Sequence, residues 1–459
     1  MEKISLIEVI NAINGKVVGS PTTSTSYIQQ VVTDSRIKTV NGLFFAIIGE
    51  NTDGHNYVSM AKENGAIAAV ISKELKEYEQ GITYILAEDT IAALKALATW
   101  YRTKFNLPVV AVTGSVGKTT TKEMIASVLG VKYNVLKTEG NLNSEIGAPL
   151  TVLNLNNSHQ IAVIEMGMDH LGQIYNISKI VKPDTAVISN IGVAHIEYLK
   201  TRENILKAKT EVFENMDEMG VAILNADDDM LVTVQNDMKK IWYGYSKNAD
   251  ARAIDAVVDY TEGVVKAKVL IKGNMYELKI PGLSKHLVYA ALSAIAVGLR
   301  YDMTVEDIIK GVESYHGIKM RMDVKKLNND ILLIDDTYNA NPVSMKSLID
   351  TVALSDKITK TVIMGDMFEL GSETLNGHKD IILHAIENNI TNVVIIGSNM
   401  KEAYDALDDD KKDKTKWYET KEELYKNMDK YLVSNSVIAV KASRGMKFET
   451  IVEKIIELI

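Results

Sequence analysis

The segment VVAVTGSVGKTTTKEM at residues 109–124 joins an apolar run, a glycine turn, a lysine and three threonines to a helix-like pattern. A strand that passes through glycines into a helix N-terminus turns backbone N–H groups toward an anion, which favours an α/β fold here. The next apolar residues share one helical face: Met124, Ile125, Val128 and Leu129. We therefore expect a phosphate-binding loop rather than a glycine turn of no special function.

The spacing of this loop is two residues shorter than the generic phosphate loop, because Val112 stands where the first glycine is expected. Lys118 is expected to reach the outer phosphates of a nucleotide, and the Thr119 hydroxyl to ligate Mg²⁺. The other residues expected at the nucleotide are Gly114, Ser115, Val116, Gly117 and Thr120. The chain lacks the guanine-recognition motif of GTPases and the catalytic Asp and Asn pattern of protein kinases. Both absences argue against a GTPase and against a protein kinase.

Composition excludes several other classes of protein. The 459 residues are 46% hydrophobic and 24% charged, with a net charge of −9, which argues against a nucleic-acid partner. Cysteine is absent, so disulfides and thiolate zinc sites are excluded, and a metal would need oxygen or imidazole ligands. The charged N-terminus and the lack of any apolar run of about 18 residues predict neither a signal peptide nor a membrane span. We expect a cytoplasmic protein.

Strand and helix patterns divide the chain into three α/β blocks, at residues 1–84, 85–315 and 316–459. In the middle block, helical patterns separate four strand candidates, which favours a parallel sheet covered by helices on both faces. Alternation at 262–280 predicts an antiparallel hairpin around Gly273-Asn274. The third block has a Rossmann-like pattern without a GxGxxG fingerprint, so no bound dinucleotide is predicted. The middle-block strands are expected at 109–113, 161–166, 185–190 and 221–227.

Polar residues follow several of these strands. Glu165 ends an apolar strand of the phosphate-loop block, where a carboxylate faces the metal beside the phosphates. The segment DDTYNANP places Asp336, Asn339 and Asn341 after another strand, and Pro342 can open a helix. Strand ends are where α/β sheets place ligands, but an Asx-rich turn explains this segment equally well, so both interpretations stay open.

His195 and Lys209 carry no clear signal of their own. A single histidine is more often structural than a metal ligand, and a lysine on a helix is usually solvated. From the pattern alone, neither residue is assigned to a site.

Six segments occur in an order that resembles the ATP-dependent Mur ligases, which build the peptide of bacterial cell-wall precursors. They are TGSVGKTTT, GNLNSEIGAPLT, AHIEYLKTRENILKAKTEVF, DDTYNANPVSM, GDMFELG and SRGM, and the resemblance covers essentially the whole chain. The segments YNANP and GDMFELG are similar to those of the members that add D-alanyl-D-alanine to UDP-N-acetylmuramoyl-tripeptide. The resemblance implies an N-terminal domain for the UDP-sugar, a central domain for ATP, and a C-terminal domain that closes and brings the dipeptide.

The resemblance also implies roles for single residues. His195 matches a ligand of a second Mg²⁺, and Lys209 matches a lysine that carries a carbamate. A carbamate converts an ammonium group that repels Mg²⁺ into an anionic oxygen ligand, which a bare lysine lacks. The residues implied near the UDP-sugar and its peptide are Ser35, Arg36, Thr138, Asn141 and Asn143.

The reaction implied by the resemblance begins when a substrate carboxylate attacks the γ-phosphate of ATP and forms an acyl phosphate. Because two anions must meet, cations are the main requirement, and Lys118 and two Mg²⁺ ions supply them. Thr119 and Glu165 are expected to hold one ion, and His195 and carbamylated Lys209 the other. An amine then attacks the acyl carbon. Its pKa of about 7.7–8.0 leaves part of it neutral near pH 7, so no strong base is needed.

The amine-side groups are hypotheses. Asp336 is expected to orient the amine, and the dipeptide carboxylate is expected to meet Asn339, Asn341 and Arg444. One departure affects the nucleotide: Leu287 and Ala290 stand where the family has asparagines. Two outcomes are open: a weaker nucleotide affinity, or a contact supplied elsewhere, for example by Arg321.

Two alternative functions remain. One is a related ligase for another amine, either another Mur ligase or an enzyme like folylpolyglutamate synthetase, and YNANP argues against it. The other is a nucleotide-binding switch without ligase activity, and the intact phosphate loop and metal candidates argue against it. We expect a monomer.

Overall fold

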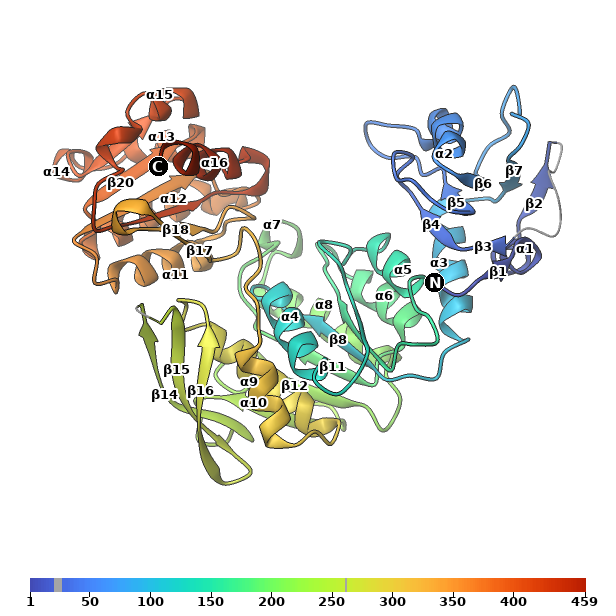
Figure 1. The fold of residues 1–459 in the computed structure, drawn as a ribbon, viewed down its shortest axis with the longest axis horizontal. Helices are drawn as coiled ribbons and strands as arrows, with labels where there is room; N and C mark the ends of the chain where they lie inside the picture. The colour runs from blue at the N-terminus through green and yellow to red at the C-terminus, as the bar shows by residue number, and fades with distance from the viewer. Residues whose placement is uncertain (20–26, 261) are drawn as a thin grey trace.

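The computed structural model describes residues 1–19, 27–260 and 262–459, and it contains three α/β units that each have their own sheet (Figure 1). The N-terminal unit (blue) and the C-terminal unit (orange to red) lie on opposite sides of the central unit. The expected α/β class with three units is confirmed. Within the described residues, no helix has both the length and the apolar character needed to cross a membrane.

The N-terminal unit has a five-stranded sheet in the order β2-β7-β6-β5-β4. Its core strands β5 and β6 are parallel neighbours, and helix α2 packs on β6. Strand β7 runs past residue 84, so the sheet extends two residues beyond the boundary expected there. The elements are β1 (Ile4–Ser5), α1 (Leu6–Ile13), β2 (Lys16–Val18), β3 (Tyr27–Ile28), β4 (Gln30–Val32), β5 (Gly42–Phe45), α2 (Val58–Glu63), β6 (Ala66–Ile71) and β7 (Thr83–Leu86).

The central unit has a nine-stranded sheet in the order β16-β15-β14-β13-β12-β11-β8-β10-β9, which is parallel from β9 to β14. Alternate residues of β8 point to opposite faces, so Val109 and Ala111 join one core while Val110 and Val112 join the other. The strands are β8 (Val109–Thr113), β9 (Val135–Lys137), β10 (Ile161–Glu165), β11 (Thr185–Ile188), β12 (Val221–Asn225), β13 (Lys239–Gly244), β14 (Ala251–Asp259), β15 (Val264–Ile271) and β16 (Asn274–Pro281).

Helices cover both faces of this sheet, as the strand and helix pattern predicts. The core on one face includes residues of α3, α5, α6 and α8, and the core on the other includes residues of α4, α9 and α10. The central helices are α3 (Thr90–Arg102), α4 (Lys118–Leu129), α5 (Gly147–Val152), α6 (Gln173–Val181), α7 (Ile196–Leu199), α8 (Arg202–Thr210), α9 (Leu287–Arg300) and α10 (Val305–Glu313).

The predicted hairpin is β15–β16, antiparallel with Ile271 opposite Asn274. The two turn residues are Lys272 and Gly273, with φ of +48° and +82°, one position earlier than expected. Positive φ at both central residues is the type I′ geometry, which fits the twist of the flanking strands. The sequence patterns gave no indication of β13 and β14, which carry the hairpin onto the parallel sheet.

The C-terminal unit has a six-stranded sheet in the order β17-β18-β22-β19-β20-β21, parallel except for the edge strand β17. Strands β18, β22 and β19 are neighbours, so the loops after them meet at one edge. These loops carry DDTYNANP, SRGM and GDMFELG. The elements are β17 (Asp323–Leu327), β18 (Ile331–Asp335), α11 (Pro342–Ala353), β19 (Thr359–Gly365), α12 (Thr374–Glu387), β20 (Asn392–Ile396), α13 (Ser398–Asp405), α14 (Asp409–Lys412), β21 (Thr415–Tyr418), α15 (Lys421–Tyr425), β22 (Ser436–Lys441) and α16 (Glu449–Leu458).

Candidate active site

The glycine loop leaves β8 and enters α4, as the sequence predicts. Gly114 has a φ of +147°, and a Cβ built on it would lie 1.9 Å from Ser189 Oγ, so a larger residue would be strained there and would displace the serine hydroxyl. Gly117 has a φ of +79° and immediately precedes the helix. Both positions use conformations that glycine adopts freely. The short loop therefore has a backbone conformation of its own and is not a generic phosphate loop with two residues removed.

The loop is held by residues that follow the neighbouring strand β11. Asn190 accepts the N–H of Val116 on its side-chain oxygen at 3.0 Å and the N–H of Ser115 on its carbonyl at 3.0 Å. The Ser189 hydroxyl donates to the Val116 carbonyl at 2.7 Å. Sequence reasoning missed Ser189 and Asn190, although their place at the end of a strand beside β8 was a usable signal.

Two lysines converge on one carbonyl of the loop. The Nζ atoms of Lys118 and Lys209 each donate to the Gly114 oxygen at 2.9 Å. Burial lowers the pKa of Lys118, and the Glu165 carboxylate opposes that shift. Burial, and then the charge of Lys118, lowers the pKa of Lys209, which is 1% exposed. The site therefore brings two amines together where a polyanion can bind.

Glu165 lies at the end of β10 with one oxygen engaged and one free. Its Oε1 accepts from the Thr119 hydroxyl at 3.2 Å and from Asn143 Nδ2 at 2.7 Å. Its Oε2 is buried and has no hydrogen-bond partner. An orphaned buried carboxylate oxygen beside a threonine hydroxyl fits a hard cation, because such a cation satisfies the missing contact with oxygen ligands.

Thr138 supports Glu165 and does not line the cleft. Its hydroxyl accepts the backbone N–H of Glu165 at 2.9 Å, and its carbonyl accepts from Lys122 Nζ at 2.5 Å. The side chain is fully buried, so the implied contact with the sugar-peptide is not seen here. The companion residues Asn141 and Asn143 do line the cleft.

His195 precedes α7 with a left-handed backbone, φ +62° and ψ +22°. Burial, together with the charges of Lys118 and Lys209, lowers its pKa to about 4. The ring is therefore neutral near pH 7, which is the form that binds metal ions. Its Nδ1 lies 3.3 Å from Glu369 Oε2, a residue of the C-terminal unit.

The protein offers few ligands per metal ion. Among the described residues, no three His, Asp or Glu side chains are grouped as a ready-made metal site. Thr119, Glu165 and His195 supply separate donors beside the phosphate loop. Mg²⁺ usually takes one or two protein ligands and completes its shell with phosphate oxygens and water, so this donor set fits magnesium bound together with a nucleotide.

The loop after β18 is fixed by a buried ion pair. Asp336 Oδ2 lies 2.5 Å from Lys441 Nζ, and Asp336 Oδ1 accepts the Met322 N–H at 3.0 Å. Lys441 also donates to the Asn339 carbonyl at 2.8 Å. Asp336 thus anchors this loop to β22 and to the segment that links the two units. Sequence reasoning missed Lys441, whose buried strand position gave no signal of a partner.

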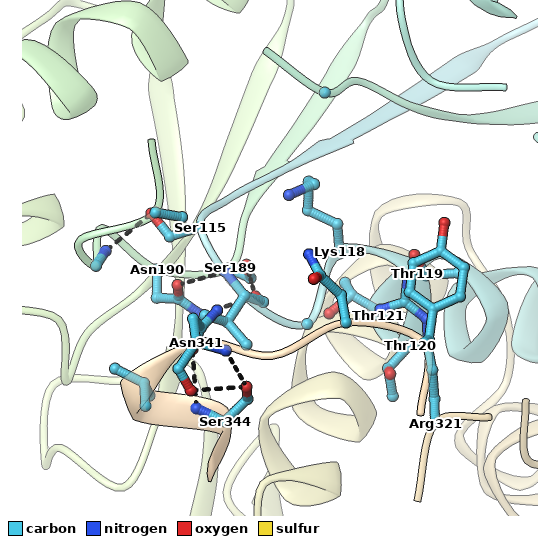
Figure 2. A pocket seen from close by; sticks show the side chains of 18 of the residues that line it. Ser115, Lys118, Thr119, Thr120, Thr121, Ser189, Asn190, Arg321, Asn341 and Ser344 are labelled. Carbon is cyan, nitrogen blue, oxygen red and sulfur yellow. Dashed lines mark hydrogen bonds between the residues drawn. The ribbon is translucent and has the colours of Figure 1, made fainter. Parts of the chain in front are cut away.

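Both interpretations of the asparagine segment hold in part. Asn341 caps α11: its Oδ1 accepts the Ser344 N–H at 2.9 Å, and its own N–H donates to the Ser344 hydroxyl at 3.1 Å. Pro342 opens the helix as predicted. Asn339 and Asn341 nevertheless line the cleft, and Figure 2 shows the Asn341–Ser344 pair beside residues of the phosphate loop.

Two arginines reach the same cleft. The Arg321 guanidinium lies over the Tyr338 ring, 4.0 Å from its centre, which is a cation–π contact. Arg444 Nη1 lies 3.0 Å from Glu449 Oε1, and the Arg444 side chain is half exposed. At the start of α9, the aromatic rings of His286 and Tyr289 line the cleft beside Leu287 and Ala290.

These residues surround one cleft of about 1050 Å³ between the central and C-terminal units. The structure brings most expected residues to it but leaves five outside the lining: Gly114, Thr138 and Lys209 lie directly behind it, whereas Ser35 and Arg36 belong to the N-terminal unit. Arg36 is exposed and pairs with Asp34 at 2.6 Å. The expected residues in the lining are Ser115, Val116, Gly117, Lys118, Thr119, Thr120, Asn141, Asn143, Glu165, His195, Arg321, Asp336, Asn339, Asn341 and Arg444.

Comparison with known proteins places this geometry in a family. The Mur ligase middle domain matches residues 112–298, and the Mur ligase glutamate ligase domain matches residues 320–444. A UDP-N-acetylmuramoyl-tripeptide–D-alanyl-D-alanine ligase of Bacillus subtilis is 37% identical over 95% of each chain. This chain belongs to the Mur ligases. A ligase of the same name from Haemophilus influenzae is 33% identical over 98% of each chain.

Solved Mur ligases share the fold. A crystal structure of MurF from Acinetobacter baumannii has a TM-score of 0.90 at 30% identity, and it covers 100% of this chain and 99% of its own. MurF from Thermotoga maritima in complex with ADP has a TM-score of 0.82 at 27% identity, and the match covers 94% of this chain and 97% of that chain. The resemblance stated from the sequence motifs is confirmed for this Mur ligase.

Proposed function

We propose that this Mur ligase joins D-alanyl-D-alanine to UDP-N-acetylmuramoyl-tripeptide, with cleavage of ATP to ADP and phosphate, in peptidoglycan precursor synthesis. The main support is similarity to two ligases named for this reaction, which are 33–37% identical to this chain along 95% or more of both chains. The cleft adds the physical means, because it joins a phosphate loop, Lys118 and a free carboxylate oxygen on one wall to amide and guanidinium groups on the other.

In the first step, the terminal carboxylate of the tripeptide attacks the γ-phosphorus, and ADP leaves. The loop N–H groups and Lys118 hold the phosphates and reduce the repulsion between the two anions. Thr119 and Glu165 would hold one Mg²⁺ that neutralises phosphate charge. The N-terminal unit would carry the UDP-sugar near Ser35 and Arg36, with the peptide extending toward Asn141 and Asn143.

In the second step, the dipeptide amine attacks the acyl carbon and phosphate leaves. The amine needs orientation more than a strong base, because part of it is neutral at a pKa of about 7.7–8.0. Asn339, Asn341 and Arg444 present donors that suit the dipeptide carboxylate, while Asp336 holds their loop through Lys441. Closure of the two units excludes water from the acyl phosphate.

Lys209 is proposed to carry a carbamate, which with His195 would hold a second Mg²⁺. Carbamate formation needs a neutral amine: the Nζ adds to CO₂ and releases one proton. Burial lowers the pKa of Lys209 and so supplies that neutral form. Lys209→Ala should lose nearly all activity, and short carboxylic acids should restore part of it. Full activity of the unsupplemented variant would remove Lys209 from the mechanism.

Two further features belong to the proposal. A monomer suffices, because one chain carries every group assigned above. We propose a cytoplasmic reaction, because the proposed substrates include ATP.

Phosphate release from ATP with UDP-N-acetylmuramoyl-tripeptide, with and without D-alanyl-D-alanine, tests the proposed function. Release should depend on the dipeptide, and a ligated product should appear by mass spectrometry. Single amino acids such as D-glutamate or L-lysine serve as competing amines. Equal turnover with one of these would favour a related ligase, and no amine dependence would contradict ligase function.

A further inference from the structure

Two residues with rare backbone conformations face each other across the cleft. His195 of the central unit has a φ of +62°, and Glu369 of the C-terminal unit has a φ of +64°. The left-handed region costs a residue with a Cβ about 1–2 kcal/mol. Such strain persists where the surrounding structure enforces it, and it concentrates at functional sites. The ring nitrogen Nδ1 of His195 lies 3.3 Å from Glu369 Oε2.

The loop that carries Glu369 is held rigidly. The N–H of Met367 donates to His378 Nε2 at 2.8 Å, and the N–H of Phe368 donates to the Ser443 hydroxyl at 2.9 Å. Leu370 is buried directly after it. Glu369 therefore projects from a fixed loop toward the central unit, and its position is set by β19, β22 and α12.

His195 has an open place for this carboxylate. Its Nδ1 is buried and has no hydrogen-bond partner of good geometry, although the Glu369 carboxylate is within ion-pair distance. The other carboxylate near His195 is Asp169, which already accepts from His170 Nδ1 at 2.7 Å. The remaining charged neighbours, Lys118 and Lys209, repel a protonated ring.

We propose that Glu369 is a positioning residue: its carboxylate accepts the Nδ1–H of His195 and so turns Nε2 toward the phosphate loop. A histidine that binds metal commonly donates its other N–H to a carboxylate, which fixes both tautomer and orientation. Because the two residues belong to different units, His195 is oriented only while the C-terminal unit is docked. Docking of the C-terminal unit against the central unit and orientation of the metal-binding histidine therefore occur together. This inference rests on the proposed function for its link to metal binding, but not for the contact itself.

The first test reads the imidazole directly. In protein with ¹⁵N-labelled histidine, the nitrogen shifts of His195 should show one tautomer, protonated at Nδ1, with a His195→Gln variant to assign the signals. Glu369→Ala should move only these signals toward a tautomer mixture and leave those of the other seven histidines in place. Unchanged His195 signals would overturn the inference.

The second test reads magnesium dependence. Loss of a carboxylate behind a metal-binding histidine typically weakens metal affinity 10- to 100-fold, so the Mg²⁺ concentration for half-maximal activity should rise about tenfold or more. The KM for D-alanyl-D-alanine should stay near that of the wild type. Glu373→Ala, an exposed residue beside the same loop, is the matched control and should change neither quantity.

A fold-safe variant separates orientation from strain. Glu369→Asn keeps a residue that tolerates the left-handed region, but its side chain is too short to reach His195. It should fold at least as stably as the wild type and show the same tautomer shift as Glu369→Ala. Wild-type shifts and magnesium dependence in this variant would contradict the proposal. If the wild type itself shows no dipeptide-dependent turnover, the proposed function fails, while the imidazole signals still decide the role of Glu369.

Discussion

At the scale of single residues, the cleft holds buried ionisable groups that lack a partner of opposite charge. Lys118 and Lys209 both donate to the Gly114 carbonyl, and Glu165 has one oxygen without a partner. Each group is buried at a cost in desolvation. A nucleotide with its metal ions supplies the missing anions and cation together, which explains why the free site holds two lysines so close.

Lys118→Met keeps the length of the side chain and removes its charge. Loss of one preorganised contact to the reacting group costs about 10²–10³ in kcat, so we expect a fall of at least that size. The melting temperature should stay within a few degrees, because burial lowers the pKa of Lys118 and the charged form gains little from folding. Phosphate release and differential scanning calorimetry measure both; a kcat within tenfold of the wild type would contradict the assignment.

Residue roles were predictable from sequence where a local pattern carries them. Lys118, Thr119 and Glu165 stand next to a buried strand, and their neighbours in sequence give their direction. Thr138 and Asp336 are different, because each acts on a partner distant in the chain, Glu165 and Lys441 respectively. No local pattern shows a partner that only the folded chain supplies.

At the scale of elements, the site depends on caps and loop anchors. Asn341→Ala removes the cap of α11 and should lower the free energy of unfolding by about 0.5–2 kcal/mol. Asn341→Asp keeps the cap, since aspartate is an equally good N-cap residue, but places a carboxylate beside the proposed dipeptide carboxylate. Its KM for D-alanyl-D-alanine should rise about tenfold or more, equivalent to 1.4 kcal/mol. Urea unfolding and initial rates separate the two effects, and an unchanged KM in Asn341→Asp would limit Asn341 to capping.

His378 makes the GDMFELG loop sensitive to acid. The ring is fully buried, accepts the Met367 N–H, and has a pKa lowered by burial. The unfolded chain therefore binds one more proton between that lowered pKa and about 6.5. The stability from neutral His378 is fully present above pH about 6.5 and is lost as pH falls through the lowered value.

His378→Leu should lose about 1–3 kcal/mol of stability at pH 7.5, because the Met367 N–H is left without a partner. The gap between wild type and variant in urea unfolding should narrow at pH 5.5, where the wild type weakens and the variant has no proton to bind at this position. An equal gap at both pH values would show that the ring does not titrate in this range.

Buried strands and the regularly alternating strands of the β15–β16 hairpin were predictable, whereas the irregular strand β14 was not. Strands β8 and β10 are continuous apolar runs, whereas β14 alternates irregularly, with a bulge between Ala253 and Asp255. Such strands are specified by the neighbours they pair with, so a short sequence window does not distinguish them from loop.

At the scale of the whole molecule, the order of the three units follows from the sequence, but their docking does not. The Tyr260 hydroxyl, at the end of β14, donates to the Thr351 carbonyl of α11 at 2.5 Å. Like the pair His195–Glu369, this contact uses residues in turns and helix surfaces, whose sequence patterns favour solvent. Contacts between units form only when each unit is already folded.

Tyr260→Phe removes that hydrogen bond and keeps the ring. A net loss of about 0.5–1.5 kcal/mol should shift the balance toward undocked molecules by about two- to tenfold. Small-angle scattering of the free protein should then give a larger radius of gyration, with Tyr57→Phe in the N-terminal unit as a control. Identical scattering curves for Tyr260→Phe and wild type would show that this bond does not hold the units together.

Gly114 has a consequence for inhibitor design. A Cβ at this position would lie 1.9 Å from Ser189 Oγ, and the φ of +147° is unfavourable for any other residue. A compound that takes its main affinity from the backbone of this turn would therefore meet a target where every substitution strains the backbone and displaces Ser189. Drug resistance by point mutation would have to arise at more distant contacts, and a screen for escape variants should return none at residue 114.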